Sequence, residues 1–158
     1  MSNDRTVLAP PGQPTISFSR EFAASAERVF AAHVDPALVA RWIGPRGTTL
    51  AMREFDARTG GHWSYVVRGS GDRSWGFHGS FHEVTAPSRL VWTFEFEDDP
   101  GRPNLEVLTF TDLGGGRSRL DGLATFLTVE HRDEMLKDME PARDEDFERL
   151  DDVLAAGS

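Results

Sequence analysis

The chain of 158 residues is 39% hydrophobic and 27% charged, a balance that is typical of a globular protein with a buried core and excludes a disordered chain. Its formal net charge of −9 is concentrated toward the C-terminus, where 11 acidic residues accompany 4 basic ones from Glu130 onward, so we expect no binding to nucleic acid. The sequence has no cysteine, no apolar run of about 18 residues and no basic-then-apolar N-terminal signal, so disulfides and thiolate chemistry are excluded and we expect a cytoplasmic protein without membrane contact.

Residues 1–14 predict a flexible leader. They contain Pro10-Pro11-Gly12 and Pro14 and few apolar side chains, a composition that disfavours regular structure. We therefore expect one domain over residues 15–156, a length that one hydrophobic core can serve.

A strand and two short helices are predicted next. Alternation predicts a strand over Thr15–Ala23 with one face formed by Ile16, Phe18, Arg20 and Phe22. Ser25 is placed to cap a first helix. Asp35-Pro36 starts a second, because aspartate caps well and proline suits the first helical position, and Gly44-Pro45 ends it.

Six more strands are predicted, each followed by a turn: Thr49–Phe55, Trp63–Arg68, Trp75–Val84, Arg89–Glu97, Leu105–Thr111 and Ser118–Leu127. Short connections favour antiparallel neighbours. A helical segment over about Glu130–Ala156 completes the order of one strand, two helices, six strands and one long helix. This order predicts an α+β fold with a curved antiparallel sheet of about seven strands and its helices on one side.

The strand over Arg89–Glu97 gives the clearest inward face, formed by Leu90, Trp92, Phe94 and Phe96. The last strand shows the same pattern in Leu120, Gly122, Ala124 and Phe126. The small residues Gly122 and Ala124 leave room for another group to approach the sheet closely.

The hairpin between Trp63 and Phe81 has two possible registers. One places Trp63 near Phe81 and Tyr65 opposite Gly79, which gathers the aromatic rings inside and covers a glycine with a ring. A slip by one residue would instead turn His78 inward, together with His82. We favour the first register.

The C-terminal helix contains two irregularities. Pro141 lies in its interior, where proline removes a backbone hydrogen bond, so we expect a kink or break there. Arg143 interrupts the apolar stripe formed by Leu136, Met139, Phe147, Leu150 and Leu154. A guanidinium in that position needs an anionic partner or a path to water.

Several blocks are typical of one family: Arg41-Trp42-x-Gly44-Pro45, Phe55-Asp56-x-Arg58-x-Gly60-Gly61-x-Trp63-x-Tyr65, Gly79-x-Phe81-x-Glu83-Val84, Pro87-Ser88-Arg89-Leu90-Val91 and Arg149-Leu150-Asp151. Through them, residues 15–155 resemble START-like (SRPBCC) domains of the type related to activators of heat-shock-protein-ninety ATPase (AHSA-type). Two segments depart from the family pattern. Ser25 stands where the family has proline, and Asp138-Met139-Glu140-Pro141-Ala142 replaces a Gly-Met-Glu-x-Gly run.

The resemblance implies a helix-grip fold, in which the curved sheet holds the C-terminal helix around a ligand cavity. The residues expected to line it are Trp42, Trp63, Tyr65, Phe77, Phe81, Trp92, Phe94, Phe110, Phe126, Met139, Arg143 and Phe147. The alternative is that these aromatic side chains simply fill a closed core, as aromatic stripes usually do. The high arginine content, with Lys137 as the single lysine, indicates a bacterial genome.

Polar candidates each have a structural alternative. Arg143 either binds a ligand carboxylate or pairs with an internal acid. His62, His78 and His82 share one parity, but under our register they lie outside without converging, so we expect no metal site. Asp56 and Arg58 predict a local ion pair at a turn, and Trp42 either borders the cavity or fixes the second helix.

Three functions follow from these patterns. The first is a binding protein for a small apolar or amphipathic molecule, with a carboxylate if Arg143 anchors it, and without cofactor or catalytic residues. The second is a cyclase-like or hydrolase-like enzyme that uses Tyr65, His78 or Arg143, although no acid–base pair has the spacing that catalysis requires.

The third is a chaperone-associated protein of the stress response, as the family implies. We expect no direct ATPase stimulation, because the activators carry an additional N-terminal domain. A homodimer through the outer sheet face is a further expectation.

Overall fold

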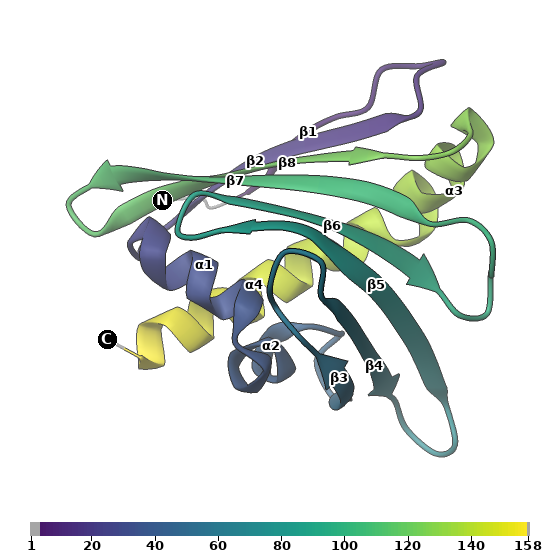
Figure 1. Cartoon of the computed structure of the whole chain (residues 1–158), viewed down its shortest axis with the longest axis horizontal. Coiled ribbons are helices and arrows are strands. Elements are labelled where there is room, and N and C mark those ends of the chain that lie inside the picture. The colour runs from purple at the N-terminus through teal and green to yellow at the C-terminus, as the bar shows by residue number, and fades with distance from the viewer. Residues whose placement is uncertain (1–3, 158) are drawn as a thin grey trace.

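The computed structural model describes residues 4–157 and contains one eight-stranded antiparallel sheet that curves around its helices (Figure 1). The order across the sheet is β1-β2-β8-β7-β6-β5-β4-β3. The strands are β1 (Thr6–Leu8), β2 (Thr15–Phe22), β3 (Thr49–Phe55), β4 (His62–Arg68), β5 (Ser74–Thr85), β6 (Arg89–Phe96), β7 (Asn104–Gly114) and β8 (Arg117–Thr125). The helices are α1 (Ala26–Val34), α2 (Pro36–Trp42), α3 (Val129–Asp138) and α4 (Glu140–Ala156). The predicted α+β helix-grip fold is confirmed.

Strand β1 lies within the segment that the sequence predicts as a leader. Thr6 pairs with Ser19 and Leu8 with Ser17, so β1 extends the sheet at its edge. Just before β1, Arg5 forms ion pairs with Glu140 and Asp144 of α4, both at 2.8 Å. The sheet therefore has one strand more than expected, and the first three residues of the expected leader lie outside the described residues.

The helix starts confirm their predicted caps. Ser25 Oγ accepts a hydrogen bond from the Arg28 amide at 3.3 Å, and Asp35 Oδ1 accepts one from the Ala37 amide at 3.0 Å. After α2 the backbone turns at Gly44, which has a φ of +100°. A Cβ there would also lie 2.9 Å from Thr48 Oγ1, so both the turn and the packing require glycine.

The expected break in the C-terminal helix is present. Helix α3 ends at Asp138 and α4 begins at Glu140, with Met139 between them. Pro141 lies in the first turn of α4, where a missing backbone N–H leaves no helical hydrogen bond unmade. The single long helix of the prediction is therefore two helices that meet at one residue.

The predicted inward faces are confirmed. Leu90 and Leu120 are fully buried, and Phe126 is buried beyond the end of β8. The group that approaches Gly122 is the ring of Phe18 on the neighbouring strand, 2.2 Å from the position a Cβ would take. The small residue on β8 thus makes room for an aromatic ring of β2.

The β4–β5 register differs from the prediction by two residues. Trp63 pairs with Gly79 and Tyr65 with Phe77. Phe81 instead exchanges backbone hydrogen bonds with Gly60 and Gly61, which extends the pairing into the turn before β4. Because side chains alternate with a period of two, this shift keeps every ring on its predicted face. The ring over Gly79 belongs to Trp63 rather than to Tyr65.

The C-terminal part of α4 joins the sheet through an apolar face and an ion pair with β2. Phe147 and Leu150 are almost completely buried, and Phe147 contacts Phe18 and Phe22 with ring centroids 5.5 and 5.6 Å apart. Asp151 accepts two hydrogen bonds from Arg20 of β2, at 2.9 and 2.7 Å. These contacts fix the C-terminal part of α4 against the sheet.

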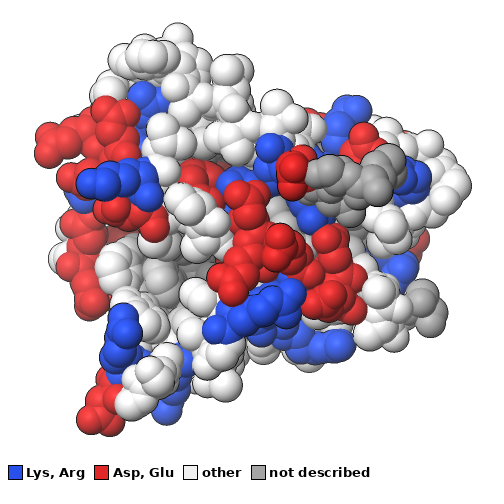
Figure 2. Space-filling model, turned by 180° about the vertical axis from the view of Figure 1, so that it is seen from behind, with Lys and Arg blue, Asp and Glu red and all other residues white. Residues whose placement is uncertain are grey.

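Charged side chains are interspersed on the surface. On the face shown in Figure 2, acidic side chains gather near the centre and basic ones border them. Within residues 4–157, no helix combines the length and apolar character that crossing a membrane requires.

Candidate functional site

A cavity of about 390 Å³ lies between the sheet and the α3–α4 segment. This volume is in the range of small-molecule sites, about 300–1,000 Å³. Ten of its 26 lining residues are Phe, Trp or Tyr: Trp42, Phe55, Trp63, Tyr65, Trp75, Phe77, Trp92, Phe94, Phe96 and Phe126. All four tryptophans of the chain border it. The rings come mainly from β4, β5 and β6, whose inward faces converge where the sheet curves.

Nine of the twelve expected site residues border this cavity: Trp42, Trp63, Tyr65, Phe77, Trp92, Phe94, Phe126, Met139 and Arg143. The other three lie in the surrounding core. Phe81 packs on Phe55, Phe110 packs on Phe30, and Phe147 lies between β2 and α2. Periodicity along a strand or a helix predicts the face of a residue but not its distance from an internal space, so it could not separate these three.

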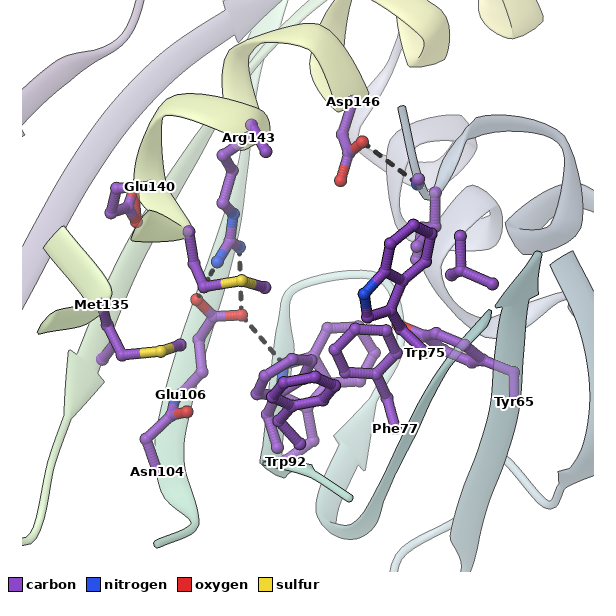
Figure 3. Close-up of a pocket in the computed structure, with 18 of the residues that line it drawn as sticks. Tyr65, Trp75, Phe77, Trp92, Asn104, Glu106, Met135, Glu140, Arg143 and Asp146 are labelled. Carbon is purple, nitrogen blue, oxygen red and sulfur yellow. Dashed lines mark hydrogen bonds and ion pairs between the residues drawn. The ribbon is translucent and has the colours of Figure 1, made fainter. Parts of the chain in front are cut away.

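Arg143 is held by an internal acid. Its two terminal nitrogens contact the two carboxylate oxygens of Glu106 on β7, at 2.8 and 3.1 Å, and Trp92 Nε1 donates to the same carboxylate at 3.0 Å (Figure 3). Burial by itself raises the pKa of Glu106, but the Arg143 charge and these hydrogen bonds outweigh it and keep the pKa below its ordinary value. Both groups are therefore charged, and they neutralise each other.

Sequence reasoning missed Glu106 but contained a signal for it. Glu106 and Asn104 alternate in phase with the buried residues Leu108 and Phe110, and β7 keeps that alternation without interruption between them. An acidic residue in phase with a buried face needs a cationic partner. Arg143 is the residue for which the sequence already predicts the need of an anionic partner.

Asp146 is the second acid of the cavity. It projects from α4 one turn after Arg143, and its Oδ1 accepts a hydrogen bond from the Gly44 amide at 3.1 Å (Figure 3). Burial raises the pKa of Asp146 to about 7, against the opposing effects of Arg143, the Gly44 amide and Arg149. This side chain therefore titrates near neutral pH.

His33 and Tyr65 are neutral members of the wall. His33 Nδ1 lies 2.8 Å from the carbonyl of Val29, which can only accept, so Nδ1 carries the proton. Burial lowers the pKa of His33 to about 4, and burial likewise raises the pKa of the Tyr65 phenol. Both side chains are therefore uncharged at neutral pH.

Trp42 combines its two expected roles. Its indole borders the cavity, and its Nε1 donates to the Ala32 carbonyl at 2.9 Å, which ties α2 to α1. Two other polar atoms of the wall are buried without a hydrogen-bond partner among the described residues: Trp63 Nε1 and Asn104 Oδ1.

The remaining candidates lie away from the cavity. His62 contacts Glu54 at 2.9 Å and His78 contacts Glu97 at 3.0 Å, both on the outer face, while His82 is exposed. No group of three or more histidine or acidic side chains within residues 4–157 is arranged to hold a metal ion. Arg58 and Asp56 form the expected local ion pair, at 2.8 Å.

Comparison with known proteins identifies the family. Residues 23–155 match the family described as Activator of Hsp90 ATPase homolog 1-like protein. The chain belongs to this family. Its match covers both short helices, strands β3 to β8 and nearly all of α4, and so includes the elements that form the cavity. No curated protein matches the chain.

Solved structures with the same architecture come from several bacteria. A protein from Rhodobacter sphaeroides is 28% identical, with a TM-score of 0.85 over 96% of this chain and 98% of its own. One from Arthrobacter aurescens is 24% identical, with a TM-score of 0.86 over 96% and 91%. Protein Ms6760 from Mycobacterium smegmatis is 22% identical, with a TM-score of 0.85 over 97% and 98%. The last two likenesses concern the fold alone.

Proposed function

We propose that this member of the family is a binding protein that encloses a small, largely apolar molecule between the sheet and α4. The observation that carries the proposal is the aromatic cavity of about 390 Å³. Aromatic rings form rigid walls with a large apolar area, and removing such an area from water favours binding by roughly 25 cal/mol per Å².

The polar groups define what the ligand needs. Arg143, the expected anchor for a ligand carboxylate, is already paired with Glu106 in a buried network. A carboxylate ligand would have to displace Glu106 and leave it buried without a counter-ion, which is strongly unfavourable. We therefore propose a ligand whose affinity comes mainly from its apolar body and not from a carboxylate.

Titration with a neutral fluorescent probe, N-phenyl-1-naphthylamine, tests the proposal. The protein should bind one probe saturably and quench the emission of its tryptophans, all of which border the cavity. Ala142→Phe, which fills the cavity from α4, should weaken binding at least tenfold. Ala156→Phe adds the same ring at an exposed position of the same helix and should leave binding unchanged. Equal affinities for these two variants, or no binding at all, would contradict the proposal.

Catalysis in the same cavity is a second candidate, and one observation favours it. The pKa of Asp146, raised by burial to about 7, suits a side chain that takes up and releases a proton at physiological pH. Tyr65 borders the same space, whereas His78 lies on the outer face and takes no part. Once a ligand has been identified by native mass spectrometry, its conversion by the native chain and not by a ligand-binding Asp146→Asn variant would establish this activity. Unchanged ligand after incubation with the native chain would exclude it.

A further inference from the structure

The polar atoms that the cavity offers to a ligand include three acceptors, and also the unpaired N–H donor of Trp63. The carboxylate of Asp146 points into the cavity from α4 (Figure 3). Asn104 Oδ1 is buried at the wall without a hydrogen-bond partner among residues 4–157. His33 has its proton on Nδ1, so its Nε2 is an acceptor as well. A ligand that supplies hydrogen-bond donors therefore matches this wall better than one that supplies acceptors.

The charges at the cavity leave one acid without a cation. Glu106 is neutralised by Arg143, and Glu140 by Arg5 at 2.8 Å. Asp146 has no ion pair within the described part of the chain, and its hydrogen bond comes from the neutral Gly44 amide. The cavity wall thus carries one unpaired negative charge whenever Asp146 is ionised.

The rings strengthen the preference for a positive group. The face of an aromatic ring attracts a cation within about 6 Å of its centroid, most strongly when water is excluded. Tyr65 lies close enough to Asp146 for the carboxylate to influence its phenol. Arg143 is the one cationic side chain among the described residues of the wall. It is stacked over Phe18 and paired with Glu106, so it does not compete for these rings.

We propose that the ligand of this cavity is a small alkyl or arylalkyl amine, whose ammonium group is bound by the carboxylate of Asp146 while the aromatic wall surrounds its apolar body. This inference deepens the proposed binding function and rests on it. An ammonium group supplies donors to these acceptors and neutralises Asp146, which has no ion pair within the described residues.

Binding of such an amine depends on pH through Asp146. The groups that face Asp146 are Arg143, Arg149 and Glu145 on α4, the Gly44 amide after α2, and Tyr65 on β4. Because the pKa of Asp146 is about 7, its carboxyl is largely protonated at pH 5.5 and largely ionised at pH 8. An aliphatic amine keeps its charge over this range, so its affinity rises with pH.

Calorimetric titration with three matched probes tests the inference: phenylbutylamine, phenylbutanol and phenylbutyrate. They share one apolar body and carry a cationic, a neutral and an anionic head. At pH 8 the amine should bind about tenfold more tightly than the alcohol, as expected for a charged hydrogen bond, and the acid should bind most weakly. The affinity of the amine should fall several-fold at pH 5.5, and that of the alcohol should not.

Two variants of α4 separate a specific contact from a general charge effect. Asp146→Asn keeps the shape of the side chain and its bond to the Gly44 amide, and should lower the affinity for the amine about tenfold while leaving the alcohol within twofold. Glu148→Gln removes the same charge at an exposed position two residues away and should change neither affinity.

The outcomes distinguish this inference from the function on which it rests. If the alcohol or the acid binds as tightly as the amine, or if Asp146→Asn retains full affinity for the amine, the inference is wrong and the binding function stands. If neither these three probes nor the neutral naphthylamine bind, both are wrong.

Discussion

Asp146 is stabilised in its protonated form by the folded protein. Burial raises its pKa from 3.8 to about 7, so between these values the folded chain holds a proton that the unfolded chain releases. The free energy of unfolding therefore falls as the pH rises through this window and stays low above it. A carboxyl group that lowers the stability of the fold at neutral pH is typical of a functional position.

Asp146→Asn should consequently stabilise the protein at pH 8, because asparagine keeps the shape of the side chain and its bond to the Gly44 amide without the charge. We expect a gain on the order of 3 kcal/mol at pH 8 that disappears near pH 4. Urea denaturation at the two pH values measures it. A gain that is the same at both would show that the charge of Asp146 is not its cause.

Arg143 and Glu106 should behave as one unit. Arg143→Met leaves the Glu106 carboxylate buried with only the Trp92 N–H as a donor, and should lower the free energy of unfolding by about 3–5 kcal/mol. The double variant Arg143→Met with Glu106→Leu should recover most of this loss, because no unpaired charge remains. Equilibrium denaturation of the two variants gives the comparison. A double variant that is no more stable than the single one would show that packing, and not charge, is lost.

The sequence indicated the need of Arg143 for a partner but not which acid meets it. Arg143 interrupts an apolar stripe, and Glu106 occupies a buried phase of β7. Predicting that the two residues pair requires knowing where α4 lies over β7, and local sequence patterns do not contain this information. Asp146 gave no comparable signal, since it is one of seven acidic residues in α4 and the sequence does not distinguish it from the others.

At the level of secondary-structure elements, β2 and β8 pack closely because the Phe18 ring of β2 lies over Gly122 of β8. Gly122→Ala would place a Cβ 2.2 Å from Phe18 Cε1, so the ring or the strand must move. We expect a loss of about 1–3 kcal/mol in the free energy of unfolding, measured by thermal or urea denaturation. Adding Phe18→Leu should make the alanine easier to accommodate. If the glycine replacement costs the same with and without the ring, the clash with Phe18 is not its cause.

Element boundaries were predictable where chemical signals mark them. Ser25, Asp35 and Pro141 are such signals, and each stands at the start or in the first turn of a helix. The β4–β5 register was not predictable, because a shift by two residues leaves the inward face unchanged. The hydrogen bonds of Phe81 with Gly60 and Gly61, before the start of β4, show which register is present. Strand β1 was missed because three residues before a proline-rich segment give too short a pattern.

For the molecule as a whole, two buried groups act in opposite directions on the dependence of stability on pH. The pKa of His33 falls from 6.5 to about 4 on folding, so its contribution to stability is present above pH 6.5 and is lost as the pH falls to 4. Asp146 contributes the opposite slope over nearly the same range. The two slopes largely cancel.

Removing the Asp146 carboxyl should reveal the pH dependence of stability that comes from His33. In Asp146→Asn the free energy of unfolding should rise with pH between 4 and 6.5, on the order of 2 kcal/mol in total, whereas the native chain should vary less. Denaturation at intervals of half a pH unit measures both curves. A flat curve for the variant would show that His33 does not resist protonation in the fold.

The arrangement of layers was predictable from alternation and element order, whereas the cavity was not. The volume of the cavity is the small difference between two large volumes, that of the space under the sheet and that of the side chains that fill it. Phe81, Phe110 and Phe147 belong to the core, while Trp92 and Phe94 border the cavity, although all five have the same inward phase. Only three-dimensional packing separates them.

The ion pair between Arg5 and Glu140 has a practical consequence for anyone who shortens this chain. A version trimmed to begin at Thr15, where alternation first becomes regular, would lose Arg5 and strip Glu140 of its counter-ion at the wall of the cavity. It would also uncover the backbone edge of β2, and bare edges invite strands from other molecules. The few residues that look dispensable in the sequence thus help to set the charge of the cavity wall and cover the backbone edge of β2.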